Sequence, residues 1–294
     1  MIKLNEIYNI DCFEGHKLID DKSIDLIYTD LPYGKQTKNK WDQPIDLEKL
    51  WIDYKRILKP KGNIVLHSQG MFTAKLMLSN EKWWKYNLVW NKKLVSGFLN
   101  ANKRQLRSHE DILVFFEKLG TYNPIFEEGA PLHSKGSKYK IKDGTNHNYG
   151  YYDSTKEDTR AGSTQKYPKS ILEFMRPKPP IHPTQKPIEL AEYIVKTYSN
   201  ENDIILDSTC GSGTIPVACV NTKRNWIAFE TDGISYPDKK LIAFEVDAYR
   251  NKIGRTWEII FNNHTSESVY YLKRAKRRLK KKIEILTEQQ IKIS

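Results

Sequence analysis

The most constraining feature of this sequence is a short glycine loop that stands between a strand pattern and a helix pattern. Residues 203–207 (DIILD) predict a buried strand that ends at Asp207. Gly211 and Gly213 follow, and residues 213–220 open a helix. Glycines let the backbone turn tightly and approach a ligand without a Cβ in the way. A Gly-x-Gly pair alone is a weak signal, but in this setting it predicts a nucleotide-type binding site.

An acidic residue at the end of the next strand pattern narrows the choice of ligand. Residues 225–230 predict a strand ending at Glu230, which lies 19 residues beyond Gly211. A carboxylate at this spacing can accept hydrogen bonds from both hydroxyls of a ribose, and an ordinary strand-end acid is the alternative. The third glycine of the dinucleotide fingerprint is missing, with Pro216 two residues beyond Thr214. This disfavours NAD and favours a cofactor with a ribose and no phosphates, such as S-adenosyl-L-methionine.

Alternating strand and helix patterns elsewhere predict an α/β fold. Further strand patterns lie at residues 25–30, 63–67, 86–90 and 111–116, and helix patterns lie at residues 47–58 and 188–198. Such alternation is typical of a mostly parallel sheet that carries helices.

Two segments differ from this pattern in composition. Residues 120–180 are rich in Gly, Lys, Tyr, Asn and Ser, and a loop of this length is usually functional or disordered. We interpret it as a nucleic-acid contact region, with a solvated insertion as the alternative. Residues 273–282 are almost wholly basic within a helical pattern, and both phosphate contact and a solvated helix face fit them.

Charge and composition bound the class of protein. The net charge of +12 over 294 residues favours a polyanionic partner. No apolar run approaches the ~18 residues of a membrane helix, and the N-terminus lacks the layout of a secretion signal. The cysteines Cys12, Cys210 and Cys219 have neither disulfide-framework nor zinc spacing, and the histidines show no ligand spacing. We therefore expect a cytoplasmic protein with no metal site and no membrane contact.

A second motif, residues 30–34 (DLPYG), begins at the polar end of the strand pattern of residues 25–30. The exocyclic amino group of a base is a weak nucleophile because its lone pair is delocalised into the ring. A site that accepts both amino hydrogens lets the nitrogen rehybridise toward a methyl donor. Asp30 offers a carboxylate for one hydrogen, the main-chain carbonyl of Leu31 or Pro32 offers the second acceptor, and Tyr33 can stack on the base. A plain strand-to-turn connection is the alternative.

Together these motifs resemble those of the DNA amino-methyltransferases in the β-type order, with the catalytic motif first and the cofactor motif last. Residues 30–33 resemble the Asp/Asn/Ser-Pro-Pro-Tyr motif, and residues 207–214 resemble the loop usually written Asp-Pro-Phe-x-Gly-Ser-Gly-Thr. Residues 182–187 (HPTQKP) resemble the segment that lines the methionine end of the cofactor. Residues 9–12 (NIDC) resemble an early stretch whose Asp lies near the cofactor adenine. The resemblance covers about residues 5–116 and 180–230.

The resemblance implies a Rossmann-like S-adenosyl-L-methionine-dependent methyltransferase sheet with helices on both faces and a permuted motif order. It implies one catalytic domain over residues 1–294, with residues 120–180 inserted as a target-recognition region. The catalytic residues implied are Asp30, Leu31, Pro32 and Tyr33. The cofactor-binding residues implied are Asp11, Cys12, Asp30, Thr184, Gln185, Lys186, Pro187, Asp207, Ser208, Thr209, Gly211, Gly213, Thr214 and Glu230.

The sequence also departs from the family pattern. Leu31 replaces the first Pro of the catalytic motif, and Ser208-Thr209 replaces Pro-Phe in the cofactor loop. Residues 271–278 approach the family's closing helix, which makes residues 231–266 an additional insertion. That insertion repeats the Ile-Ala-Phe-Glu of residues 227–230, so Glu245 is the alternative ribose acid if the register has shifted.

The resemblance implies a site-specific DNA methyltransferase that acts on the exocyclic N6 of an adenine flipped out of double-stranded DNA. Asp30 favours adenine, because cytosine-N4 enzymes of the family more often carry Ser at that place. An N4-cytosine enzyme and a catalytically disabled DNA-binding relative are the alternatives, and RNA or protein amino-methylation could use the same core. The absence of a Pro-Cys dipeptide disfavours cytosine-C5 chemistry. A cognate restriction endonuclease as partner, or none, and a monomer or a homodimer all fit the sequence.

Overall fold

The computed structural model describes residues 2–34, 42–131, 145–146, 150–151, 162–176, 185–211 and 213–231. The chain divides into two compact units, of which the smaller is Tyr122–Ser170. Within the smaller unit, β6 (Glu127–Glu128) pairs antiparallel with β9 (Gln165–Lys166), and β7 (Thr145–Asn146) pairs antiparallel with β8 (Gly150–Tyr151). The target-recognition role of residues 120–180 stays a prediction.

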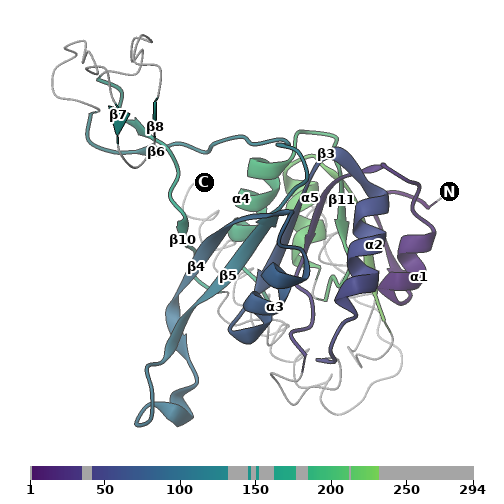
Figure 1. Cartoon of the computed structure of the whole chain (residues 1–294), viewed down its shortest axis with the longest axis horizontal. Coiled ribbons are helices and arrows are strands. Elements are labelled where there is room, and N and C mark those ends of the chain that lie inside the picture. The colour runs from purple at the N-terminus through teal and green to yellow at the C-terminus, as the bar shows by residue number, and fades with distance from the viewer. Residues whose placement is uncertain are drawn as a thin grey trace, which may run out of the picture. The chain divides into compact units, whose positions relative to one another are not determined.

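An eight-stranded sheet forms the centre of the larger unit (Figure 1). Its strands, in spatial order, are β1 (Glu6–Asn9), β12 (Asn225–Glu230), β11 (Ile204–Asp207), β2 (Ile24–Thr29), β3 (Leu58–Ser68), β5 (Arg107–Phe115), β4 (Trp84–Ser96) and β10 (Ile171–Glu173). Neighbours in this sheet pair parallel, except that β5 is antiparallel to both β3 and β4.

Helices cover both faces of the sheet (Figure 1). The helices of one face are α1 (Cys12–Lys17), α2 (Leu47–Ile57) and α3 (Met71–Ser79), and those of the other are α4 (Ile188–Tyr198) and α5 (Thr214–Asn221). The side chains of β2 contribute to the apolar clusters on both faces of the sheet, because successive side chains of a strand point to opposite faces. Leu26 and Tyr28 belong to the apolar cluster of α4 and α5, whereas Ile27 belongs to the cluster of α1, α2 and α3.

The expected Rossmann-like sheet with helices on both faces is confirmed, and α4 spans the residues that its periodicity predicts. The pattern did not predict β1, α1, α3 or β10. The helix α1 has 6 residues and begins after Asp11, whose carboxylate accepts from the N–H of Phe13, and so short a helix shows no periodicity. The residues of the expected 231–266 insertion beyond Thr231, the closing helix at 271–278 and Glu245 lie outside the described residues.

This topology places the predicted motifs at one edge of the sheet. Asp30 directly follows β2, Asp207 ends β11 and Glu230 ends β12, and these strands are parallel neighbours. Ligands of open α/β sheets bind outside the carboxyl ends of such strands. Among the described residues, no helix is both long and apolar enough to span a bilayer.

Candidate active site

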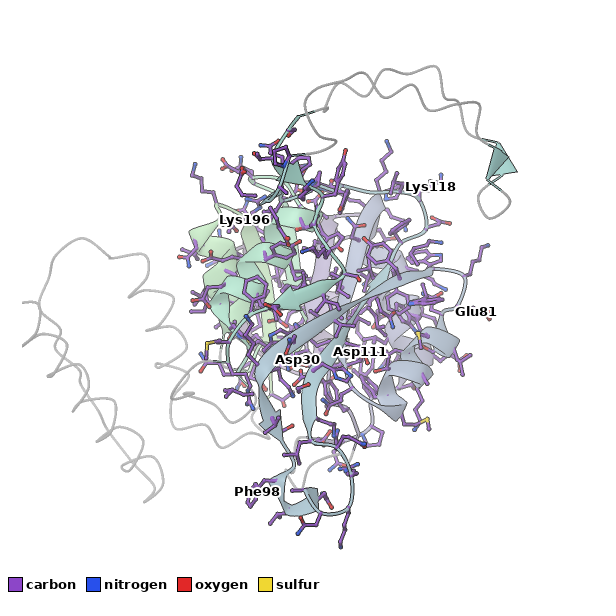
Figure 2. All side chains as sticks on the ribbon, turned by 90° about the vertical axis from the view of Figure 1, so that its left-hand side faces the viewer. Asp30, Glu81, Phe98, Asp111, Lys118 and Lys196 are labelled. Atoms are coloured by element: carbon purple, nitrogen blue, oxygen red, sulfur yellow. The ribbon has the colours of Figure 1, made fainter. Side chains whose placement is uncertain are left out.

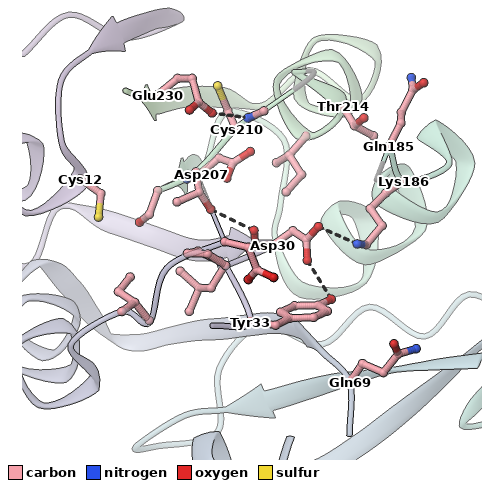
Figure 3. A pocket seen from close by; sticks show the side chains of 18 of the residues that line it. Cys12, Asp30, Tyr33, Gln69, Gln185, Lys186, Asp207, Cys210, Thr214 and Glu230 are labelled. Carbon is pink, nitrogen blue, oxygen red and sulfur yellow. Dashed lines mark hydrogen bonds and ion pairs between the residues drawn. The ribbon is translucent and has the colours of Figure 1, made fainter. Parts of the chain in front are cut away.

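A cavity of about 970 Å³ lies at this carboxyl edge. The predicted site residues that line it are Asp11, Cys12, Asp30, Leu31, Pro32, Tyr33, Gln185, Lys186, Asp207, Ser208, Thr209, Gly211, Thr214 and Glu230. Figure 3 shows ten residues of its wall by name, drawn from segments far apart in the sequence. Pro187 and Gly213 precede α4 and α5 and lie outside the lining, and Thr184 lies outside the described residues.

The glycine loop is closed by the acid at the end of β12. The N–H of Gly211 donates to Oε2 of Glu230 at 2.7 Å, and the N–H of Thr231 donates to Oε1 at 3.0 Å. Gly211 has φ +49° and Gly213 has φ +76°, the left-handed region that favours glycine. Burial raises the pKa of Glu230. Each carboxylate oxygen can accept more than one hydrogen bond, so Glu230 retains acceptor capacity on the cavity side.

Asp207 is buried beneath the loop. Its Oδ1 accepts from the hydroxyl of Thr29 at 2.8 Å and from the N–H of Thr209 at 3.3 Å. Burial raises the pKa of Asp207 to about 8, against the lowering effect of the hydrogen bonds from Thr29 and Thr209. At neutral pH this carboxyl group therefore mainly holds a proton, and it braces the end of β11 against the end of β2.

The Ser-Thr pair that replaces Pro-Phe makes specific contacts. Oγ of Ser208 accepts from the hydroxyl of Tyr54 at 2.9 Å and lies 3.0 Å from Nε2 of His16. Nδ1 of His16 lies 3.2 Å from Oδ2 of Asp53. Burial lowers the pKa of His16, which favours the neutral ring, with Nδ1–H donating to Asp53 and Nε2 accepting from Ser208. This polar brace ties α1 and α2 to the cofactor loop.

The sequence does not single out His16 as a site residue. It lies 192 positions from Ser208, and no spacing rule connects the two. The local signal is a single polar ring in a short helix that also carries the exposed side chains of Glu14 and Lys17, and such a signal is common in proteins.

The second residue of the Ser-Thr pair joins the two motifs. Oγ1 of Thr209 donates to the main-chain carbonyl of Asp30 at 3.1 Å and lies 2.9 Å from the hydroxyl of Thr29. Leu31, which replaces the first Pro of the catalytic motif, is 1% exposed and belongs to the apolar cluster below the loop. The catalytic motif is therefore held by core packing on one side and by the cofactor loop on the other.

Both carboxylate oxygens of Asp30 accept hydrogen bonds (Figure 3). The hydroxyl of Tyr33 donates to Oδ1 at 3.0 Å, and Nζ of Lys186 donates to Oδ2 at 2.6 Å. The ring of Tyr33 stacks on Phe72 with 5.3 Å between centroids. Burial raises the pKa of the Tyr33 phenol well above its ordinary value.

Lys186 is shared between two acids. Its Nζ also lies 3.3 Å from Oε2 of Glu110, and Oε1 of Glu110 accepts from Nζ of Lys92 at 3.2 Å. Burial opposes ionisation of Glu110, but the charges of Lys186 and Lys92 outweigh it and lower its pKa to about 2. Burial likewise opposes the charge of Lys186, and Asp30 and Glu110 outweigh that effect, so its pKa is raised. This part of the cavity wall thus brings the ammonium groups of Lys92 and Lys186 against the carboxylates of Asp30 and Glu110.

Neither Glu110 nor Lys92 was predicted from the sequence. Lys186 was predicted as a cofactor contact, and the structure places its ammonium against the catalytic motif. Its cofactor role stays a prediction. Among the residues that the structure describes, no group of three His, Cys, Asp or Glu side chains could hold a metal ion.

Comparison with known proteins gives a family model that spans most of the chain. A model described as DNA methylase, of the N6/N4 class, matches residues 24–234. The type II methyltransferase M.HinfI of Haemophilus influenzae is 28% identical over 266 residues, which are 78% of this chain and 65% of that one. The type II methyltransferase M.HpaI of Haemophilus parainfluenzae is 25% identical over 224 residues, 73% of this chain and 66% of that one. The chain thus spans just under two thirds of the length of these two relatives.

Solved structures with the same fold cover most of the chain as well. The PvuII DNA methyltransferase, described as cytosine-N4-specific, has a TM-score of 0.55 at 16% identity, covering 90% of this chain and 89% of that one. TTHA0409 of Thermus thermophilus, in complex with S-adenosyl-L-methionine, has a TM-score of 0.52 at 17% identity, covering 84% of this chain and 96% of that one. At these identities the likeness concerns the fold.

Proposed function

Because the chain belongs to the DNA methylase family, we propose that it transfers a methyl group from S-adenosyl-L-methionine to the exocyclic N6 of an adenine in double-stranded DNA. The observation that carries this proposal is the junction of the two motifs in one cavity. Oγ1 of Thr209, from the cofactor loop, donates to the main-chain carbonyl of Asp30, from the catalytic motif. A cofactor held by the loop and a base held by the motif would therefore meet at this wall.

The cofactor would be held by its ribose and by the glycine loop. Glu230 would accept from the ribose hydroxyls, since its carboxylate lines the cavity and retains acceptor capacity. Asp11 and Cys12 would lie near the adenine, and the segment that includes Gln185 and Lys186 would face the methionine end. Bound there, the cofactor supplies a methyl group activated by a sulfonium charge. The complex of TTHA0409 with S-adenosyl-L-methionine supports this choice of cofactor.

The base would be positioned by Asp30 and Tyr33. The carboxylate of Asp30 would accept one amino hydrogen, and the carbonyl of Leu31 or Pro32 would accept the other, so that the nitrogen lone pair points at the methyl carbon. As the methyl carbon leaves the sulfonium sulfur and bonds to the nitrogen, positive charge would develop on the nitrogen beside the carboxylate of Asp30, which would stabilise the transition state and then accept the proton that the nitrogen releases. Each oxygen of Asp30 already accepts one hydrogen bond and can accept a second, so the amino hydrogen of the base would be accepted beside the ammonium of Lys186 or the hydroxyl of Tyr33.

The N4 amino group of cytosine is the second candidate substrate. It presents the same two N–H groups to the same acceptors, and the PvuII enzyme of like fold is described as cytosine-N4-specific. The acid at position 30 supports adenine, because cytosine-N4 members of the family more often carry Ser there.

The test is transfer of labelled methyl from S-adenosyl-L-methionine to unmethylated bacterial DNA, followed by mass spectrometry of the nucleosides. N6-methyladenine is the expected product. N4-methylcytosine as the product would support the proposed site and mechanism and would make cytosine the target base. Absence of label from DNA, with cofactor binding retained, would contradict the proposal and support a disabled relative or another substrate.

A further inference from the structure

The strands β4 and β5 continue past the edge of the sheet as a two-stranded ribbon. Along β4, pairing with β10 stops at Asn91. Along β5, which runs back from the ribbon, pairing with β3 begins only at Asp111. Pairing between β4 and β5 nevertheless continues to Ser96 and Arg107. We name residues 92–107 the ribbon. Among the described residues, its two sides pair with each other, and no third strand pairs with either of them.

The ribbon ends in a short 3-10 turn, η1 (Phe98–Asn100). Figures 1 and 2 show it projecting from the sheet, with Phe98 labelled at its far end in Figure 2. The register shifts between Asn91 and Ser96, where five steps of β4 oppose two steps of β5, so the ribbon contains a bulge on its β4 side.

The ribbon leaves the sheet at the edge that carries the active site. Since β3 and β4 are both antiparallel to β5, they run in the same direction, and the carboxyl end of β4 lies at the edge of Asp30. Ser96, Gly97 and Arg107 line the same cavity as Asp30. Nη1 of Arg107 donates to Oε1 of Gln69, another lining residue, at 2.6 Å. The ribbon is therefore a continuation of the cavity wall.

The surface of the ribbon combines exposed apolar and basic side chains. Phe98 is 76% exposed and Leu99 is 82% exposed, side by side at the tip. Lys103 and Arg104 in the turn after η1 and Arg107 at the start of β5 are exposed. No acidic residue occurs from position 91 to position 108. Single exposed apolar residues are ordinary, but an adjacent pair at the end of a projecting basic ribbon requires an explanation.

Charge and size favour one occupant for this surface. A cationic ribbon without a single acid is complementary to a polyanion, and specific contacts between proteins normally bury far more than the two side chains of the tip can cover. Proteins that distort DNA insert apolar side chains between base steps, flanked by basic groups on the phosphates. The ribbon has both features and adjoins the cavity that would receive a base.

We propose that the ribbon inserts into double-stranded DNA, with Phe98 and Leu99 occupying the base stack where the target base leaves it and Lys103 and Arg104 contacting the flanking phosphates. This inference rests on the proposed function, since a base enters the cavity only if it is first extruded from the duplex. It assigns part of the DNA contact to the ribbon, in addition to the predicted target-recognition region.

The first test uses the full chain with Phe98→Ala and Leu99→Ala together. The control is Leu78→Ala, which removes a side chain that is also 76% exposed, near the carboxyl end of α3. The probe is a duplex that carries the methylated sequence mapped from bacterial DNA treated with the wild-type protein. We expect kcat/KM to fall about 10- to 100-fold in the double variant, because unstacking a base costs enough to change a rate by that factor. The control should match the wild type.

A second duplex distinguishes insertion of Phe98 and Leu99 into the base stack from a purely structural role of these two side chains. Placing an abasic site opposite the target base removes its partner, so extrusion needs less help from the protein. On this duplex the double variant should recover to within about threefold of the wild type. A variant that stays slow on both duplexes, or that is as fast as Leu78→Ala on the paired duplex, would overturn the insertion.

A binding measurement tests the phosphate contacts without any methyl transfer. The variant with Lys103→Gln and Arg104→Gln is titrated with a fluorescent duplex over a series of salt concentrations. Each lost phosphate contact lowers the slope of log affinity against log salt by about 0.9, so we expect a decrease of about 2. If the variant has a smaller slope than the wild type but the wild type transfers no methyl group, the proposed function is refuted and the ribbon is still a DNA contact. An unchanged slope would refute the phosphate contacts.

Loss of self-association in the Phe98 and Leu99 double variant, with kinetics unchanged, would overturn the insertion and would instead make the tip an interface between copies of the chain.

Discussion

Nζ of Lys186 lies 2.6 Å from Oδ2 of Asp30, across 156 positions of sequence. The acid proposed to hold the substrate amino group is therefore neutralised by a cation that a second acid, Glu110, also contacts at 3.3 Å. When the amino group of a base reaches Asp30, Glu110 gives the ammonium of Lys186 a place to remain. The contact with Glu110 keeps this ammonium paired, and an unpaired buried charge would be strongly destabilising.

Asp30→Ala should abolish methyl transfer and leave cofactor binding intact. The substitution removes the acceptor for one amino hydrogen, while the glycine loop and Glu230 keep their contacts. Labelled transfer and calorimetric titration with S-adenosyl-L-methionine check the two parts separately. Retained transfer in this variant would refute the assigned mechanism.

Glu110→Gln should destabilise the protein by about 2–4 kcal/mol at neutral pH, because it leaves two buried ammonium groups with one acid. The pKa of Glu110 is lowered from 4.5 to about 2, so its contribution is present above pH 4.5 and is lost as the pH falls toward 2. Urea unfolding at several pH values measures this, and wild type and variant should converge at the acid end. The control Glu14→Gln removes a surface pair with Lys17 and should leave stability unchanged. Equal stability of Glu110→Gln and wild type at pH 7 would contradict the role of the buried cluster.

Asp207→Asn should remove a pH dependence of stability that extends from about pH 4 to about pH 8. The pKa of Asp207 is raised from 3.8 to about 8, so the folded protein holds a proton that the unfolded chain has released. Stability should therefore fall between pH 4 and 8, by up to about 1.4 kcal/mol per pH unit from this group. The variant should gain on the wild type from pH 5 to pH 8 in thermal unfolding. A constant difference over that range would show that Asp207 ionises freely.

Ser208→Ala should weaken the brace between the cofactor loop and the helices α1 and α2. The hydroxyl of Tyr54 and the ring of His16 lose their shared partner in a buried site, which costs about 1–3 kcal/mol. Ser23→Ala, which removes an exposed hydroxyl, is the matched control and should change stability by less than about 0.5 kcal/mol. Equal melting temperatures for the two variants would show that the brace contributes nothing.

Glu230→Gln should lower the affinity for S-adenosyl-L-methionine about 10- to 100-fold with little loss of stability. An amide oxygen can still accept from the N–H of Gly211, but charged hydrogen bonds to the ribose become neutral ones. Glu201→Gln, on the surface beside Lys223, is the control. A variant with wild-type affinity would remove Glu230 from the cofactor site and direct attention to Glu245.

Local patterns explain which elements the sequence predicts well. The helix α4 and the strand, loop and helix around Gly211 carry their signals within a few consecutive residues. The direction of β5 leaves no such signal, because β5 is buried on both faces and therefore reads as a continuous apolar run, as a parallel strand does. The ribbon was missed for a related reason: the patterns at 86–90 and 111–116 end where one face of the sheet stops being buried, although the backbone pairing continues.

The parts of the site that the sequence does not predict depend on contacts between residues far apart in the sequence. Asp30, Glu230 and the glycine loop were predicted because each lies in a recognisable motif. Glu110 is one of many acids in strands, and only the fold brings it to Lys186. The brace of His16 and Ser208 arises in the same way, from side chains whose chemistry is ordinary until burial removes their access to water.

The hydroxyl of Thr209 connects the loop of one ligand to the main-chain carbonyl that directly precedes the acceptors of the other. If the loop and the motif bind the two proposed ligands, a shift of the loop on binding the cofactor would move the backbone that contacts the base. Thermodynamic linkage makes such coupling reciprocal: whatever factor the cofactor applies to the affinity for the base, the base applies to the affinity for the cofactor. The order in which the two ligands arrive would then leave the stability of the ternary complex unchanged, and a single hydroxyl would set the degree of cooperativity.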